Sequence, residues 1–398
     1  MGKKTIRDVD IRGKRVLMRV DFNVPLNKDL KIDDDTRIKA SLPTIKYGLD
    51  NNARLILMSH LGRPNGKVQP DMRLDPVAER LAELLNRSVT KLDECVGKSV
   101  KRAVSEIKNG DVVLLENLRF HAEEEENDLG FAKELASLGD VYVNDAFGTA
   151  HRAHASTEGV TRFLKPAVAG FLLAKEIEYF DKVLSDPAKP FVAILGGAKV
   201  SDKIMVIENL LDKVDSLLIG GGMAYTFIKA EDKEIGSSKV ENDKLDVARA
   251  LIEKARKKNV KLVLPLDHLI ADKIDAASNT RVVDETIPKT WMAVDIGPKT
   301  VDEFKKELRN ARTIMWNGPL GIFEISKFAR GTEDIARFIS GLKATTIIGG
   351  GDTASAISKF GLENSMTHIS TGGGASLEYL EGHVLPGIAV LDDKEGAI

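Results

Sequence analysis

The stretch Phe191-Val192-Ala193-Ile194-Leu195-Gly196-Gly197-Ala198-Lys199 decides the fold class. Five apolar residues follow one another without alternation, and glycines and a segment of helical period come next. A strand that is apolar along both faces is covered on both faces, which is typical of a parallel sheet flanked by helices. The stretch therefore predicts one strand, loop and helix of an α/β fold.

Further apolar runs of this kind recur along the 398 residues. Each is short and is followed by a loop and a helical pattern, which indicates repeated βαβ units. At about 150 residues per domain, the length suggests two or three domains. We expect two doubly wound, Rossmann-like parallel sheets, with strands near 15–20, 54–59, 111–115 and 141–144, and near 191–195, 216–219, 261–264, 292–295, 313–316 and 345–348.

A helical pattern lies between the two groups of strands. Apolar residues recur at helical spacing from Phe171 to about Ser185, and Asp186-Pro187 ends the pattern. We expect a helix over 171–185 that connects two domains. The alternative is a helix in the outer layer of one domain.

The composition narrows the class of protein. The net charge of −2 gives no bulk attraction to nucleic acid or to membranes. The single cysteine, Cys95, excludes an intrachain disulfide framework and fits a reducing compartment. No apolar stretch reaches the roughly 18 residues that span a bilayer. We expect a soluble cytoplasmic protein, and the 30% of charged residues with one glutamine, Gln69, suggests adaptation to heat.

Arginine and histidine end the apolar runs of the first half. One such arginine alone would suggest a surface ion pair of about 0–1 kcal/mol. Several at strand ends suit a small polyanion, because each guanidinium can donate two hydrogen bonds to a carboxylate or phosphate, and ligands bind at this edge of such sheets. The candidates are Arg37, Arg63, Arg119 and Arg152, with Asp21 and Asn23 for hydroxyl and carbonyl oxygens and His60, His151 and His154 as further polar groups.

Two other features of this half have simpler interpretations. The spacing of His151 and His154 would suit two ligands of a zinc ion, but the intervening Arg152 would repel a dication. We therefore favour contact of these histidines with an anion. A packed core histidine is the alternative for His154. The charge run Glu123–Glu126 is interpreted as a solvated helix start without a function.

Glycine runs end the apolar runs of the second half, at 196–197, 220–222, 349–351 and 372–374. Glycines between a strand and a helix let backbone N–H groups approach phosphates. Each run alone could be only a tight turn. The sequence contains neither a Walker A motif nor a Gly-x-Gly-x-x-Gly fingerprint.

The residues beside the glycines favour a nucleotide and a metal ion. Lys199 and Lys203 are four apart at the expected start of a helix, so we place them on one face beside its N-terminus. Asp352 and Thr353 open another expected helix and offer a carboxylate to Mg²⁺ and a hydroxyl to phosphate.

A turn between Asn317 and Glu324 adds polar groups suited to phosphate and ribose. The chain thus carries two candidate anion sites of different design, which implies two substrates. A phosphoryl group passed between them is the economical interpretation.

With these residues the sequence resembles the phosphoglycerate kinase family over essentially its whole length. The segments that carry the resemblance are Arg19-Val20-Asp21-Phe22-Asn23-Val24-Pro25, Ser59-His60-Leu61-Gly62-Arg63-Pro64, Asp145-Ala146-Phe147-Gly148-Thr149-Ala150-His151-Arg152-Ala153-His154, Leu195-Gly196-Gly197-Ala198-Lys199-Val200, Trp316-Asn317-Gly318-Pro319 and Gly349-Gly350-Gly351-Asp352-Thr353. The resemblance implies two domains facing across a cleft: a phosphoglycerate-binding domain (1–170), a linking helix (171–185), a nucleotide-binding domain (186–375) and a returning C-terminal segment (376–398). It implies the reversible reaction of ATP with 3-phosphoglycerate to give ADP and 1,3-bisphosphoglycerate, with Mg²⁺.

The resemblance also implies roles for matching residues. Phosphoglycerate would be bound by Asp21, Asn23, Arg37, His60, Arg63, Arg119 and Arg152. The nucleotide would be bound by Gly197, Lys199, Lys203, Gly221, Gly297, Asn317, Glu324, Gly350, Gly351, Asp352 and Thr353, with Asp352 holding Mg²⁺ and Glu324 the ribose.

The implied reaction fits what the sequence lacks. Its nucleophile is a carboxylate, already ionised at neutral pH, so no general base is needed. Catalysis reduces to alignment and charge neutralisation, for which we expect Arg37, Lys199, Lys203 and the backbone N–H groups of Gly373 and Gly374. We expect domain closure with hinges at the ends of the 171–185 helix and at 370–372.

Two other functions are weighed against this one. A kinase that forms another acyl phosphate, from acetate or carbamate, would leave the four arginines unexplained. A non-catalytic nucleotide-binding protein would be expected to lack Arg37, Lys199 or Asp352, and all three are present. We expect a monomer whose partners are small molecules.

Overall fold

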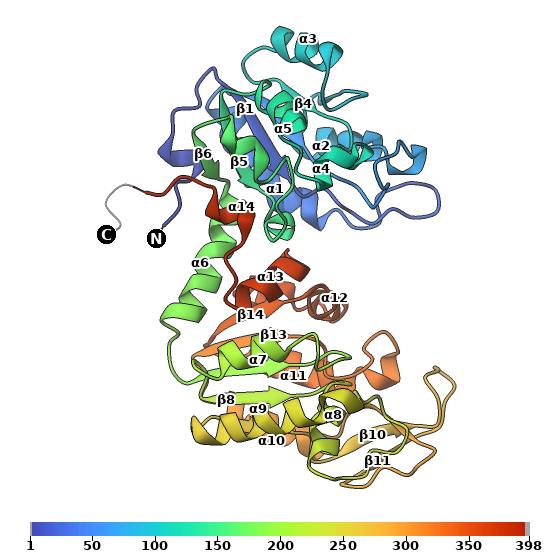
Figure 1. Ribbon diagram of the computed structural model, residues 1–398. Coiled ribbons are helices and arrows are strands. Elements are labelled where there is room, and N and C mark those ends of the chain that lie inside the picture. Colours follow the sequence, from blue (N-terminus) through green and yellow to red (C-terminus); the bar gives the residue numbers. More distant parts are fainter. Residues whose placement is uncertain (1, 395–398) are drawn as a thin grey trace. The chain divides into compact units, whose positions relative to one another are not determined.

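A computed structural model describes residues 2–394 of the chain, and Figure 1 shows its helices and strands. The chain divides into two compact units. The first unit consists of two segments, one up to Glu178 and one from Val384 onward. The second unit runs from Tyr179 to His383. Each unit is built around its own six-stranded sheet, in which every pair of neighbouring strands is parallel.

The sheet of the first unit has the strand order β3-β4-β2-β1-β5-β6. Its strands are β1 (Arg15–Val20), β2 (Arg54–Met58), β3 (Thr90–Lys91), β4 (Val112–Leu114), β5 (Val141–Asp145) and β6 (Ala167–Ala169). Its helices are α1 (Thr36–Asp50), α2 (Asp75–Leu85), α3 (Lys98–Glu106), α4 (Ala122–Glu125) and α5 (Leu129–Ala136), with short 3-10 turns η1 (Ile6–Asp8), η2 (Pro70–Met72), η3 (Leu118–Phe120), η4 (Phe147–Thr149) and η5 (Gly159–Arg162).

The strand β1 shows why these runs form a two-sided sheet. Val16, Met18 and Val20 are buried in one apolar cluster with Ile38 and Ile45 of α1. Leu17, between them in the sequence, points to the opposite face and is also fully buried. Both faces of the strand are therefore covered, as the unbroken apolar run predicts.

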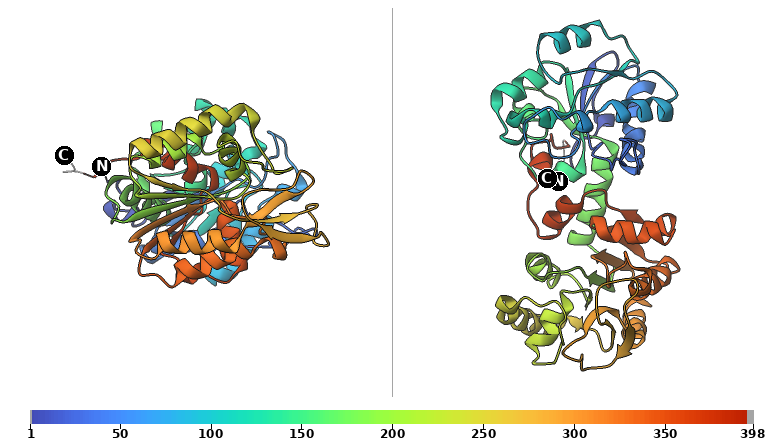
Figure 2. Two further views of the ribbon diagram at one scale, coloured as in Figure 1. Left: turned by 90° about the horizontal axis from the view of Figure 1, so that it is seen from below. Right: turned by 90° about the vertical axis from the view of Figure 1, so that its right-hand side faces the viewer.

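The sheet of the second unit has the order β15-β14-β13-β7-β8-β9. In Figure 2 it lies between α9, in yellow, and α10 with α11, in orange. Its strands are β7 (Phe191–Leu195), β8 (Ser216–Ile219), β9 (Lys261–Val263), β13 (Thr313–Asn317), β14 (Thr345–Gly349) and β15 (His368–Ile369). Its helices are α7 (Ile204–Leu210), α8 (Ala224–Ala230), α9 (Leu245–Lys257), α10 (Pro298–Leu308), α11 (Arg330–Ser340), α12 (Gly351–Lys359) and α13 (Gly373–Leu380), with 3-10 turns η6 (Asn242–Lys244), η7 (Ser326–Phe328) and η8 (Glu363–Ser365).

The second unit also contains an antiparallel sheet, with the order β11-β10-β12. Its strands are β10 (His268–Ala271), β11 (Thr280–Val283) and β12 (Met292–Ile296). The strand expected near 292–295 is therefore present, but its placement in a parallel sheet was wrong. A short apolar run reports burial and not the direction of the neighbouring strand, and the largely exposed β11 shows that this small sheet is covered less completely.

The helix expected between the two groups of strands is α6 (Phe171–Ser185), which contains the boundary between the units. The described residues from Val384 to Lys394 belong to the first unit. There the amide of Asn144 donates to the carbonyl of Gly387 near α14 (Pro386–Ala389), at 2.9 Å. The segment 370–372, where we expected a hinge, lies within the second unit between β15 and α13. Across the described part of the chain, the helices are too short or too polar to cross a membrane.

Candidate active site

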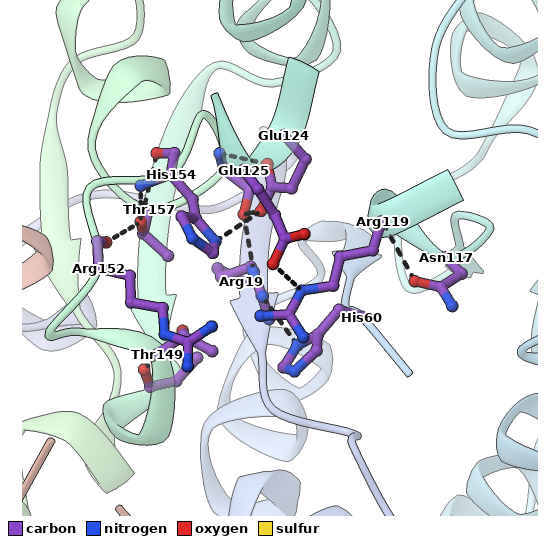
Figure 3. Close-up of polar contacts among 12 residues, drawn as sticks. Arg19, His60, Asn117, Arg119, Glu124, Glu125, Thr149, Arg152, His154 and Thr157 are labelled. Atoms are coloured by element: carbon purple, nitrogen blue, oxygen red, sulfur yellow. Dashed lines mark hydrogen bonds and ion pairs between the residues drawn. The ribbon is translucent and has the colours of Figure 1, made fainter. Parts of the chain in front are cut away.

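Polar residues collect at the carboxyl edge of the first unit's sheet. Asp21 follows β1, His60 follows β2, Arg119 lies in η3 after β4, and Arg152 follows β5. The carboxyl ends of parallel strands meet at one edge, so the topology brings these residues together. Figure 3 shows three of them, His60, Arg119 and Arg152, gathered around the end of β1. We call this set, with Arg37 and Asn23, the basic cluster.

Two hydrogen bonds position Arg37 and Asn23 in the basic cluster. Arg37, in the first turn of α1, donates from Nη1 to Oδ2 of the buried Asp21 at 2.7 Å. The side-chain oxygen of Asn23 accepts from the backbone N–H of Gly62 at 2.9 Å. Arg37 thus keeps part of its guanidinium for a ligand while its position is set by a carboxylate.

His60 is 4% exposed and lies against Arg19, whose Nη2 is 3.1 Å from its Nδ1. A guanidinium can only donate, so Nδ1 accepts and the proton of the neutral ring is on Nε2. Burial, and then the charges of Arg19, Arg119 and Arg37, hold the pKa of His60 well below its usual range. His60 is therefore a neutral N–H donor at neutral pH.

The remaining arginines of the first unit differ in how firmly they are held. Arg119 is buried, donates from Nη1 to the carbonyl of Gly62 at 2.9 Å and pairs through Nε with Glu125 at 3.2 Å. Arg152 donates from Nε to Nε2 of His151 at 3.2 Å. Arg63 is exposed and makes no ion pair within residues 2–394. Its position leaves its guanidinium available to a ligand.

The sequence interpretation missed part of this site. Glu124 belongs to the run expected to be solvated, yet its side chain is fully buried and accepts hydrogen bonds from the hydroxyl of Ser156 at 2.5 Å and its backbone N–H at 2.9 Å. Arg19 is 1% exposed and points inward to Ser156 and His60. Four successive acidic residues show no periodicity that would distinguish the buried member.

The second unit contains a cavity of about 400 Å³ at the carboxyl edge of its sheet. Four residues of the predicted nucleotide set line it: Gly197, Gly221, Glu324 and Asp352. Tyr225, Pro319 and Leu320 supply apolar walls. Such a volume, mostly apolar with a few polar groups, suits a small molecule with a ring system.

The glycines beside this cavity allow three backbone segments to touch. A Cβ on Gly221, whose φ is +65°, would lie 2.7 Å from the backbone N and O of Gly197. A Cβ on Gly318, whose φ is +98°, would lie 2.2 Å from the carbonyl oxygen of Gly196. Glycine is required here by close packing as well as by the turn, whatever ligand the cavity takes.

Lys199 and Lys203 are not on one face of a helix as expected. The helix α7 begins only at Ile204, and residues 198–203 form turns before it. Lys199 is exposed, whereas Lys203 is 7% exposed and donates its ammonium to Oδ1 of Asn317. The four-residue spacing of the two lysines is typical of a helix, and nothing in the sequence marked the turns that precede α7.

Asn317, Thr353 and the third glycine run form a second polar group at the end of β13. Gly350, with φ of +85°, faces the amide of Asn317, and Thr353 accepts the N–H of Gly318 at 2.6 Å. Gly351 and the exposed Asp352 open α12 as predicted.

The electrostatics connect this group to the cavity. Burial lowers the pKa of Lys203 to about 8, and the nearby carboxylates of Asp202 and Asp352 act in the opposite direction. Asp352 lines the cavity, so a charged group bound there would also act on Lys203.

Three further predicted positions, Gly297, Gly373 and Gly374, lie outside the cavity lining. Gly297 precedes α10 and lines a separate cavity of about 340 Å³, where a Cβ would clash with the carboxylate of Asp267. Gly373 and Gly374 begin α13, so their backbone N–H groups lie in the first turn of a helix. Within the described residues, no cluster of three or more His, Cys, Asp or Glu could hold a metal ion by itself.

The chain is similar to known proteins over nearly its whole length. A family model described as "Phosphoglycerate kinase" matches residues 6–383. The phosphoglycerate kinase of Pelotomaculum thermopropionicum is 57% identical over 395 residues, covering 99% of this chain and 100% of the relative. That of Synechococcus elongatus is 57% identical over 400 residues, with the same coverage. The solved structure of phosphoglycerate kinase from Coxiella burnetii superposes with a TM-score of 0.88 at 42% identity over 98% of each chain.

Proposed function

The chain belongs to the phosphoglycerate kinase family, and from this premise we propose how its residues divide the reaction between the two units. Its activity is that of the family in glycolysis and gluconeogenesis. A phosphoryl group passes reversibly between ATP and the carboxylate of 3-phosphoglycerate. The assignment of residues to the two substrates is supported by the chemistry of each site.

The first unit binds 3-phosphoglycerate. The observation that carries this assignment is the basic cluster, in which neutral His60 and several guanidinium groups share one sheet edge. Arg119 and Arg152 suit the phosphate of the substrate, and Arg63 is free to close on it. Asp21 and Asn23 suit the hydroxyl group, because they supply acceptors beside the cations.

The second unit binds ADP or ATP. The cavity lined by Gly197, Gly221 and Tyr225 suits the base and ribose, with Glu324 at the ribose hydroxyls. Lys199, Lys203, Asn317 and Thr353, with the N–H groups of Gly350 and Gly351, suit the phosphates. The buried amide Nδ2 of Asn317 has no hydrogen-bond partner in the described structure, and a phosphate oxygen would satisfy it.

The family uses a magnesium nucleotide. Magnesium ions of kinases take one or two protein carboxylates and complete their coordination with phosphates and water. Asp352 fits this pattern, because it is an exposed carboxylate beside the cavity at the start of α12. When bound there, the ion would neutralise charge on the phosphates. Asp352 would hold the ion, and the ammonium of Lys203 would supply a second positive charge beside the phosphates.

Catalysis consists of alignment and charge neutralisation. The substrate carboxylate attacks without a general base, since it is ionised at neutral pH. Arg37, Lys199 and Lys203 would stabilise the charge of the phosphoryl group in transit, with the N–H groups of Gly373 and Gly374. The two substrates must meet with water excluded, so we propose that the units close when both ligands are bound. Small-angle scattering should then show compaction only with both ligands.

Membership of the family also supports proposals about the partners, oligomeric state and location of the protein. The partners are small molecules, ADP or ATP and 3-phosphoglycerate or 1,3-bisphosphoglycerate, and we propose no nucleic-acid or membrane partner. We propose a monomer that works in the cytoplasm. Sedimentation at working concentrations tests the first point, since a dimer would double the mass of 43.5 kDa.

A coupled assay of ATP turnover tests the function. It compares 3-phosphoglycerate with acetate, each with Mg²⁺ and with excess chelator. We expect turnover only with 3-phosphoglycerate and Mg²⁺. Equal turnover with acetate would contradict the role given to the basic cluster, because acetate carries no phosphate for the arginines to bind.

A further inference from the structure

Three buried polar side chains of the first unit form a hydrogen-bonded group beside His60. Arg19 is 1% exposed, and Glu124 and Ser156 are fully buried. They come from β1, α4 and the loop after β5, which the topology brings together at one sheet edge. Figure 3 shows Arg19 between Glu124 and His60. A buried cation and a buried anion of this kind persist only when both are paired and hydrogen-bonded.

The hydrogen bonds of this group branch at Arg19, which donates toward Glu124 through Ser156 and also directly to His60. Arg19 donates from Nε to the hydroxyl oxygen of Ser156 at 2.8 Å, and the hydroxyl donates to Oε1 of Glu124 at 2.5 Å. Arg19 also donates from Nη2 to Nδ1 of His60 at 3.1 Å. Because guanidinium is only a donor and an ionised carboxylate only an acceptor, each proton has one allowed position.

Glu124 also fastens the loop that follows β5. Its second carboxylate oxygen accepts the N–H of Ser156 at 2.9 Å, and its backbone carbonyl accepts the N–H of Ala155 at 2.9 Å. Glu124 therefore holds the Ser156 hydroxyl where Arg19 can reach it. Arg19 makes a further hydrogen bond to the carbonyl of Val20 at the end of its own strand.

From this chain of donors we propose that Glu124, acting through Ser156 and Arg19, is a positioning residue that fixes His60 in the tautomer protonated on Nε2. The Nη2 of Arg19 disfavours a proton on Nδ1, which would place two donors against each other. His60 then presents an N–H donor to an oxygen atom of the acid substrate. This last step rests on the assignment of 3-phosphoglycerate to the first unit, whereas the tautomer does not.

The tautomer is measured without substrate. Long-range ¹H–¹⁵N correlation spectra of the full chain with ¹⁵N-labelled histidine distinguish the two ring nitrogens, and a His60→Gln variant assigns the signals. We expect the pattern of a neutral ring protonated on Nε2 in the unchanged protein. In Ser156→Ala and Glu124→Gln we expect the two ¹⁵N shifts of His60 to move toward each other, as tautomers exchange or the ring gains a second proton.

The matched control is Glu123→Gln, which makes the same change of charge and shape at an exposed neighbour in α4. It should leave the His60 signals unchanged. A native ring protonated on Nδ1 would overturn the proposal. So would a Ser156→Ala variant that folds and keeps the native His60 signals, and this small variant decides the matter if Glu124→Gln fails to fold.

Steady-state kinetics test whether the tautomer of His60 matters for the binding of 3-phosphoglycerate. We expect Ser156→Ala to raise the KM for 3-phosphoglycerate roughly 10-fold, with the KM for ATP unchanged and kcat within about a factor of two. An equal loss for both substrates would mean a structural role and would contradict positioning. His60 could instead show the expected tautomer while its ¹⁵N signals stay unchanged when 3-phosphoglycerate is added. That result would refute the assignment of 3-phosphoglycerate to the first unit.

Discussion

The ammonium of Lys203 donates to the side-chain oxygen of Asn317, and the amide nitrogen of the same Asn317 is buried without a partner among the described residues. The contact is between a buried cation and a neutral acceptor, so burial prevails and lowers the pKa of Lys203 to about 8. An anion beside the pair would supply both a counter-charge and an acceptor. The arrangement is therefore suited to a phosphate group.

This relationship predicts proton uptake when the nucleotide binds. Lys203 is charged below a pH of about 8 and partly neutral above it. Phosphates raise its pKa, so MgADP should bind with uptake of up to one proton at pH 8.5 and with almost none at pH 6.5 from this group. Calorimetry in two buffers of different ionisation enthalpy measures the uptake. Lys203→Met should abolish it, and persistence in that variant would contradict the assignment.

Arg37→Ala and Lys199→Ala should lower kcat much more than they weaken binding of either substrate. If each residue stabilises charge in the transition state, the loss is about 3 kcal/mol or more. Arg37→Lys is the matched variant, because it keeps a cation near Asp21 but loses the fork of donors. Unchanged turnover in any alanine variant would remove that residue from the mechanism.

Arg63→Ala should raise the KM for 3-phosphoglycerate and leave kcat nearly unchanged. Arg63 is exposed and unpaired in the described structure, so its removal disturbs no internal contact. Interactions with the non-reacting phosphate serve mainly for binding. Steady-state kinetics check this, and a loss confined to kcat would speak against a binding role.

Gly221→Ala should destabilise the protein and abolish nucleotide binding. Its φ of +65° and the 2.7 Å approach to Gly197 leave no room for a Cβ, which costs roughly 1–3 kcal/mol. Gly351→Ala is the control, because a Cβ there meets nothing within 4 Å. It should keep native stability while weakening ADP binding, if phosphate approaches that backbone. Unfolding in urea and ADP titrations separate the two effects.

Asp145→Asn should make the stability of the first unit less dependent on pH. Burial raises the pKa of Asp145 to about 7, whereas the pKa of an unfolded aspartate is about 3.9. The folded chain holds this proton more tightly, so its stabilising contribution is complete below pH ~4 and is lost as the pH rises toward ~7. The loss is at most about 4 kcal/mol.

The asparagine cannot ionise but retains an acceptor for the N–H groups of Leu172 and Leu173, which Asp145 accepts at 2.9 and 3.3 Å. The difference in free energy of unfolding between variant and native chain should therefore grow between pH 4 and 7 in favour of the variant. Urea unfolding at several pH values measures it. A constant difference would contradict the prediction. Any slope left in the variant belongs to other groups such as Asp295, whose pKa burial raises to about 8.

The sequence predicted the fold well because apolar runs report burial directly. Every strand expected from such a run exists, with its bounds within one residue. The antiparallel pairing of β12 was not predictable, since pairing direction depends on which distant strand lies beside it. The two-residue strands β3 and β15 are too short to leave a pattern.

The places of several candidate residues in the fold were predictable from residue type and position in the sequence, whereas their roles stay predictions. Guanidinium groups at strand ends and Asp352 after three glycines fall where expected. The burial of Glu124 and the inward turn of Arg19 depend on tertiary contacts with Ser156, more than 30 residues away from either in sequence. The turns that separate Lys199 from α7 likewise depend on packing, including the hydrogen bonds from Ser201 to Glu241.

The most direct test of the central claim, that each unit binds its own substrate, is hydrogen exchange with one ligand at a time, followed by mass spectrometry. We predict that 3-phosphoglycerate alone slows exchange at 59–63 and 149–154, and that MgADP alone slows it at 219–224 and 349–354. Protection of the same unit by both ligands would contradict the account.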